Sequence, residues 1–111
     1  TLWGRDRDHG KFALPYLVQQ HCRDTARTVG LYDRGVLAPG YRADVNVIDF
    51  DGLRLSPPEI HYDLPAGGRR LLQKVQGYKH TIVNGVETYQ DGEATGALPG
   101  ALVRGAQPAP A

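Results

Sequence analysis

Apolar residues recur at helical spacing in one stretch of the chain, residues 14–29. The stripe consists of Leu14, Leu17, Val18, Cys22, Thr25, Ala26 and Val29. Polar residues take the other side, so the pattern predicts an amphipathic helix with one packing face. Pro15 suits the first helical turn, where its missing N–H is harmless. Gly30 suits the position just past the end, where a left-handed residue closes the helix.

A second pattern predicts a strand in residues 44–50, DVNVIDF. One face would carry Val45, Val47 and Asp49, and the other Asn46, Ile48 and Phe50. Apolar groups on both faces are typical of strands that are covered on both sides, and we expect this here. Pro39 and Gly40 just before it form a turn pair, because proline presets φ and glycine accepts a positive φ.

A hairpin is predicted near the end of the chain. Asn84 and Gly85 separate two β-rich runs, residues 79–83 and 86–90. Asn-Gly is the strongest two-residue hairpin signal, because both residues tolerate positive φ and the turn matches the twist of the strands. We therefore expect a type I′ turn between antiparallel strands.

Two segments lack such periodicity. Residues 1–11 alternate in charge and carry the only tryptophan, and they are predicted to form a loop. Gly67 and Gly68, followed by Arg69 and Arg70, would suit an anion-binding loop. A Walker lysine pattern is missing, so a turn leading into a strand is the preferred interpretation.

The composition excludes several classes of protein. The 111 residues suit one small domain or a piece of a larger one, and 41% are hydrophobic, which argues against disorder. A formal net charge of +1 gives no electrostatic case for nucleic acid or for a membrane surface. No apolar run is long enough to span a bilayer. Methionine is absent and the first residue is Thr1, so we expect a C-terminal fragment of a longer protein.

The sequence offers no grouped metal ligands. Histidine occurs at His9, His21, His61 and His80, without His-x-His or His-Glu-x-x-His spacing. The single cysteine, Cys22, cannot form an internal disulfide, which suits a cytoplasmic location. Since it lies on the apolar side of the predicted helix, we expect a buried, inert thiol. No metal and no catalytic residue is predicted within this chain.

Residues 35–50, GVLAPGYRADVNVIDF, resemble the point where metal-dependent amidohydrolases leave their catalytic barrel and enter a small β domain. The matching residues are Gly30, Leu31, Gly35, Leu37, Pro39, Gly40, Ala43, Asp44, Val45, Val47 and Asp49. The phrases DLPAGGRRL, at residues 63–71, and TGALPGALVRG, at residues 95–105, are similar to the branch that hydrolyses N-acyl-D-amino acids. The resemblance covers residues 1–105.

The resemblance implies an α+β fragment in three parts. Residues 1–30 would be the last loop and helix of a TIM barrel. Residues 31–105 would be strands and tail of the small, sandwich-like β domain. Residues 106–111, AQPAPA, are predicted to be a disordered tail. The helix of residues 14–29 would then lack the barrel strands, so we expect the fragment to self-associate through its apolar stripe.

The resemblance also implies an activity for the full-length protein: hydrolysis of N-acyl-D-amino acids by metal-bound water, with zinc as the cofactor. The metal ligands and the proton-shuttling aspartate of that family have no match here, so the fragment alone should be inactive and hold no zinc. Trp3, Arg5 and Arg7 would lie near the pocket mouth and bind the carboxylate of the substrate. The alternatives are a dihydroorotase-like or hydantoinase-like cyclic amidohydrolase, or a non-catalytic, β-rich interaction module.

Overall fold

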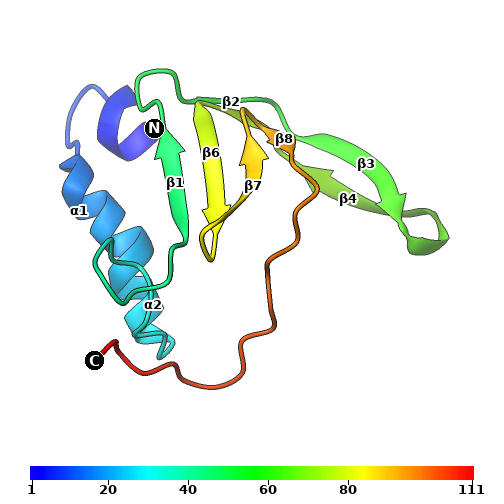
Figure 1. The fold of residues 1–111 in the computed structure, drawn as a ribbon. Coiled ribbons are helices and arrows are strands. Elements are labelled where there is room, and N and C mark those ends of the chain that lie inside the picture. Colours follow the sequence, from blue (N-terminus) through cyan, green and yellow to red (C-terminus); the bar gives the residue numbers. More distant parts are fainter.

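The computed structural model describes all of residues 1–111. Its helical segment consists of α1 (Leu14–Gln19), a π-helical turn (Gln20–Asp24) and α2 (Thr25–Thr28), which follow one another without a break (Figure 1). Proline occupies the first turn, and Gly30 takes a φ of +78° just past the end. The predicted helix and both of its end signals are therefore confirmed.

The π-helical turn is a feature that the periodicity did not predict. The hydroxyl of Thr25 donates to the carbonyls of His21, at 2.8 Å, and Cys22, at 3.3 Å. Threonine hydroxyls that bond back to the preceding turn compete with the backbone N–H groups for the same acceptors. This competition favours the wider turn in the middle of the helix.

The main sheet is antiparallel and has four strands in the order β1-β6-β7-β8. The strands are β1 (Val45–Ile48), β6 (Tyr78–Val83), β7 (Val86–Gln90) and β8 (Glu93–Ala94). Val83 pairs with Val86, so Asn84 and Gly85 alone form the turn, with φ of +50° and +80°. The predicted two-residue hairpin with two positive φ angles is confirmed.

Two smaller pairs of strands extend from this sheet. β2 (Arg54–Leu55) pairs with β5 (Val75–Gln76), and β3 (Glu59–Leu64) pairs with β4 (Gly68–Leu72). A short 3₁₀ turn, Pro65–Gly67, joins β3 to β4, so the preferred interpretation of the double glycine as a turn into a strand is confirmed. The β3–β4 hairpin projects from the body as an arm (Figure 1).

Three expectations about local structure and burial are wrong. Residues 2–6 form a π-helical turn, Leu2–Asp6, where a loop was predicted. Strand β1 is not covered on both faces, since Val47 and Ile48 are 45% and 42% exposed. Cys22 is exposed rather than buried. The two errors of burial share one cause: the apolar pattern marks faces that need cover, and the 111 residues do not supply it.

The chain has no buried core. No residue is buried, and the accessible surface is 8562 Å². A folded monomer of this mass, 12.1 kDa, exposes about 6,000 Å². The radius of gyration is 16.3 Å, whereas a compact domain of this length has about 13 Å. Both values describe an open arrangement of secondary structure.

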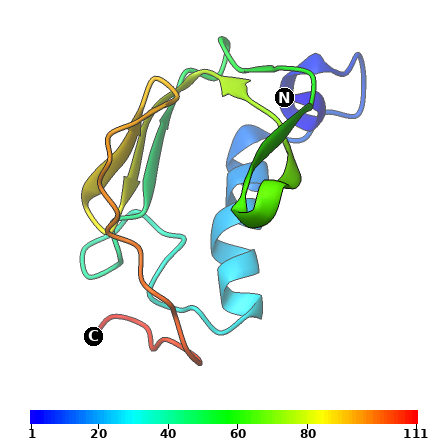
Figure 2. The ribbon, with the colours of Figure 1, turned by 90° about the vertical axis from the view of Figure 1, so that its right-hand side faces the viewer.

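Helix and sheet form two layers, and the C-terminal tail returns to the end of the helical segment (Figure 2). The N–H of Gln107 donates to the carbonyl of Gly30 at 2.9 Å, and the N–H of Tyr32 donates to the carbonyl of Gln107 at 3.0 Å. These bonds hold one residue of the tail that was predicted to be disordered. None of the helices has the length and apolar character that crossing a membrane requires.

Candidate functional site

The N-terminal turn carries the three residues that the sequence proposes for substrate binding. The backbone N–H groups of Gly4, Arg5 and Asp6 all donate to the carbonyl of Thr1, at 3.3, 2.8 and 3.0 Å. These bonds fix the backbone from which the Trp3 and Arg5 side chains extend. The N–H of Phe12 donates to the carbonyl of Trp3 at 2.9 Å, so the loop that contains Arg7 is closed on the turn.

Arg5 reaches from this turn to the segment that follows β1. Its Nη1 donates to the carbonyls of Phe50 and Asp51, at 2.6 and 2.8 Å, and its Nη2 donates to the carbonyl of Leu53 at 2.6 Å. Its Nε donates to Oδ1 of Asp6 at 2.6 Å, and Nη2 reaches Oδ2 at 3.3 Å. One side chain therefore connects residues that are more than forty positions apart in sequence.

The ion pair with Asp6 also sets the charges at this place. Hydrogen bonding to Asp6 raises the pKa of Arg5 above its ordinary value, and the same bond lowers the pKa of the Asp6 carboxyl. The pair is therefore fully ionised at neutral pH. An open hollow of about 410 Å³ lies beside it, lined by Thr1, Arg5, Asp6, Leu53, Arg54 and Leu55.

Trp3 and Arg7 form a separate contact. The Arg7 guanidinium carbon lies 4.0 Å from the centroid of the Trp3 ring, within the range of a cation–π interaction. The Trp3 ring is 5.8 Å from that of Phe12, which is 5.5 Å from that of Tyr16. The structure thus brings Trp3 and Arg7 together, whereas Arg5 is engaged elsewhere.

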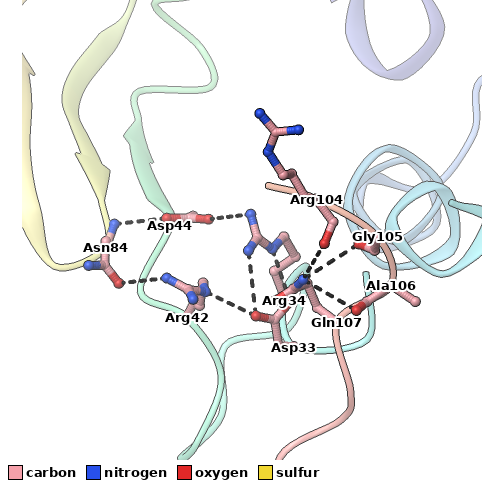
Figure 3. Close-up of polar contacts among 9 residues, drawn as sticks. All are labelled: Asp33, Arg34, Arg42, Asp44, Asn84, Arg104, Gly105, Ala106 and Gln107. Carbon is pink, nitrogen blue, oxygen red and sulfur yellow. Dashed lines mark hydrogen bonds and ion pairs between the residues drawn. The ribbon is translucent and has the colours of Figure 1, made fainter. Parts of the chain in front are cut away.

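A polar network connects the end of the helical segment to the main sheet (Figure 3). Asp33 accepts from Nε of Arg34 and from Nε of Arg42, each at 3.0 Å. Arg42 also donates to Oδ1 of Asn84 at 3.4 Å, and Asp44 accepts the backbone N–H of Asn84 at 2.8 Å. We call these five residues, Asp33, Arg34, Arg42, Asp44 and Asn84, the junction network.

The junction network shows what one residue of the sequence signature at residues 35–50, Asp44, does in the fold. Asp44 of that signature holds the turn between β6 and β7 in place, and the N–H of Gly85 donates to the carbonyl of Ala43 at 2.9 Å. Hydrogen bonds from Arg34 and then Arg42 lower the pKa of Asp33, whose side chain is only 15% exposed. Sequence reasoning missed Asp33, Arg34 and Arg42, because no spacing rule pairs them.

The histidines do not converge on a common point. His80 contacts Glu87 across β6 and β7, and His61 contacts Glu59 along β3. No three histidine, cysteine, aspartate or glutamate side chains of the chain come close enough to hold a metal ion. The residues present therefore do not fit the zinc that the resemblance implies for the full-length protein, and no catalytic step can be assigned through it here.

Comparison with known proteins gives matches of two kinds. Residues 4–89 match the amidohydrolase family. The chain is also 46% identical over 59 residues to proteins named 5-methylthioadenosine/S-adenosylhomocysteine deaminase from two strains of Desulfitobacterium hafniense, DSM 10664 / DCB-2 and Y51. These alignments cover 51% of this chain and 13% of each relative. No solved structure matches the chain.

The match to the amidohydrolase family covers most of the chain. It begins in the N-terminal turn, at Gly4, and runs through the helical segment and the junction network to Tyr89 in β7. The match therefore includes the sequence signature at residues 35–50 and the predicted hairpin. The chain belongs to the amidohydrolase family.

Proposed function

We propose that this chain is the C-terminal segment of a metal-dependent amidohydrolase that hydrolyses N-acyl-D-amino acids to a carboxylate and a free D-amino acid. The observation that carries the proposal is the family match over residues 4–89, which favours an enzyme over a non-catalytic interaction module. The branch is supported by the phrases at residues 63–71 and 95–105. The curated relatives are almost eight times longer than the part that matches this chain, which covers 13% of each.

In this proposal the 111 residues contribute architecture and a substrate contact. Residues 1–30 are the last loop and helix of the barrel, and residues 31–105 form most of the small β domain. The uncovered apolar side chains of the helix, such as Val18 at 52% exposure, support this placement because a barrel would cover them. Catalytic residues and zinc ligands would come from the remainder of the polypeptide, in the cytoplasm.

A second activity is favoured by the relatives at 46% identity, which are named as deaminases of 5-methylthioadenosine and S-adenosylhomocysteine. Deamination and deacylation both break a bond from carbon to nitrogen by hydrolysis. They differ in the product, since a deaminase releases ammonia and a deacylase releases a free amino acid. A cyclic amidohydrolase of the dihydroorotase or hydantoinase kind would release neither.

The product separates the three activities in one experiment. The full-length polypeptide would be incubated with N-acetyl-D-amino acids, with 5-methylthioadenosine and with a hydantoin. We expect free D-amino acid from the first, no ammonia from the second and no ring opening of the third, with N-acetyl-L-amino acids as the matched control. Ammonia from 5-methylthioadenosine without amino acid release would replace the proposal with the deaminase activity.

A further inference from the structure

The two arginines of the N-terminal turn differ in their free hydrogen-bonding capacity. A guanidinium has five N–H donors. The five bonds of Arg5, to Asp6 and to the carbonyls of Phe50, Asp51 and Leu53, use all of them. A carboxylate could bind Arg5 only by displacing acceptors of the chain itself. The structure therefore assigns Arg5 to holding the segment after β1, not to a ligand.

Arg7 is in the opposite state. Its guanidinium has no hydrogen bond and no salt bridge within the chain, and its side chain lies over the Trp3 ring at 4.0 Å. A Cβ placed on Gly10 would lie 3.8 Å from Nη2 of Arg7, so Gly10 is near the guanidinium. Contact with the Trp3 ring restricts the side chain while leaving its donors open.

The surface next to Arg7 is apolar and aromatic. Trp3, Phe12 and Tyr16 form a row of neighbouring rings, here called the aromatic row, and are 50%, 46% and 48% exposed. Half-exposed rings in a row offer faces on which an apolar group can stack. The carboxylate nearest in sequence on one side, Asp6, is paired with Arg5, and Asp8 on the other side forms no ion pair with Arg7.

We propose that Arg7 and the aromatic row form a binding site for a carboxylate that carries an apolar or aromatic group. Arg7 would bind the carboxylate through two parallel hydrogen bonds, and the rings would cover the apolar part of the ligand. That this ligand is the N-acyl amino acid substrate rests on the proposed function. Binding itself does not depend on hydrolysis, so the site and the activity can be tested separately.

The test uses the full-length polypeptide and two probes that have no amide bond. These are 3-phenylpropionate and the neutral 3-phenylpropanol, which share the ring and differ in the charged group. Calorimetric titration would measure the Kd of each probe for the wild type, Arg7→Gln, Arg5→Gln and the control Arg69→Gln. Arg69 lies on β4, is exposed and makes no side-chain hydrogen bond or salt bridge.

We expect Arg7→Gln to raise the Kd for 3-phenylpropionate roughly 10- to 100-fold, the usual range for a lost charged hydrogen bond, and to leave the Kd for 3-phenylpropanol unchanged. Arg69→Gln should change neither Kd. Arg5→Gln should lower the melting temperature and raise the Kd of both probes to the same degree. An unchanged Kd for 3-phenylpropionate in Arg7→Gln would overturn the proposal, as would a selective loss of that probe in Arg5→Gln.

Hydrolysis assays on the same proteins separate this site from the proposed function. Arg7-dependent binding without release of any D-amino acid would leave the carboxylate site standing and reject the activity. Release of D-amino acid with a KM that Arg7→Gln leaves unchanged would reject the site and keep the activity. A selective rise in KM for N-acetyl-D-phenylalanine in Arg7→Gln, at unchanged kcat, would support both.

Discussion

The turn between β6 and β7 offers the sharpest test of the fold, through the substitution Gly85→Ala. Gly85 has a φ of +80°, and a Cβ placed there would meet nothing within 4 Å. Steric collision with neighbours therefore contributes nothing to the cost of the substitution. The cost comes from forcing an alanine into the left-handed region.

That cost can be estimated from the backbone alone. A residue with a Cβ loses roughly 1–2 kcal/mol in the left-handed region relative to its preferred conformations. Glycine also loses more conformational freedom on folding than alanine, by about 0.5–1 kcal/mol, which offsets part of the strain. The expected net loss in the free energy of unfolding is about 1 kcal/mol.

Urea unfolding followed by circular dichroism would measure this loss in the polypeptide that carries the segment. Gly100→Ala is the matched control, because Gly100 also has open space around it and no positive φ. At Gly35 the φ is +82°, and a Cβ would lie 2.7 Å from the carbonyl oxygen of Cys22, so Gly35→Ala should cost clearly more than Gly85→Ala. Equal midpoints for Gly85→Ala and the wild type would refute the assignment of the turn.

Two further predictions concern the junction network and the helix. Arg34 and Arg42 lower the pKa of Asp33, so its contribution to stability is present above the ordinary carboxyl pKa of about 4 and is lost as pH falls through the lower folded value. Asp33→Asn should therefore lower the free energy of unfolding at pH 7, and the difference in this free energy between variant and wild type should become smaller below about pH 4. Urea melts at both pH values would measure it, and a difference that does not change with pH would argue against the ion pairs. We expect the isolated 111-residue chain to self-associate through the open side of its helix, and Val18→Lys to reduce this in sedimentation experiments, whereas a monomer at all concentrations would contradict it. Val18 is a better position for this substitution than Leu17, because Val18 is exposed, whereas Leu17 lies against Gly4 and its replacement would also disturb the fold.

Elements with local causes were predictable from the sequence. The Asn84-Gly85 turn depends on the φ preferences of two adjacent residues, and the helix depends on a stripe that lies within residues 14–29. Both were confirmed because no distant contact was needed to specify them. The π-helical turn at Gln20–Asp24 was missed, although Thr25 offered a hydroxyl that could compete for helical acceptors.

Elements with long-range causes were not predictable. Arg5 bonds to carbonyls at residues 50, 51 and 53, and no spacing rule relates an arginine to backbone atoms so far along the chain. The β3–β4 arm combines the two kinds of cause. Its turn was predicted, but its register depends on cross-strand contacts such as the ion pair between Asp63 and Arg70.

The expectations about burial failed for a different reason, which also bears on stability. The alternation of apolar residues in β1 and on the helix reports which faces were selected to be covered, not which residues provide the cover. The arm shows the same property, since Ile60, Tyr62 and Leu64 alternate along β3 and are 58%, 68% and 43% exposed. A lone two-stranded hairpin is marginally stable in water and needs a third strand or a helix against its apolar face.

The hydrogen-bond count leads to the same conclusion about cover. The chain has 48 backbone–backbone hydrogen bonds, whereas a compact protein of 111 residues has about 75 to 80. Its surface exceeds that of a compact monomer by about 2,500 Å², which is about the share that each partner contributes to a permanent interface of about 5,000 Å² in total. Neither the arm nor the helix can gain much more from within these residues. In the proposed full-length enzyme, most of the stability of this segment would therefore come from protein that covers its open faces, and substitutions on those faces should weaken that association more than the local fold.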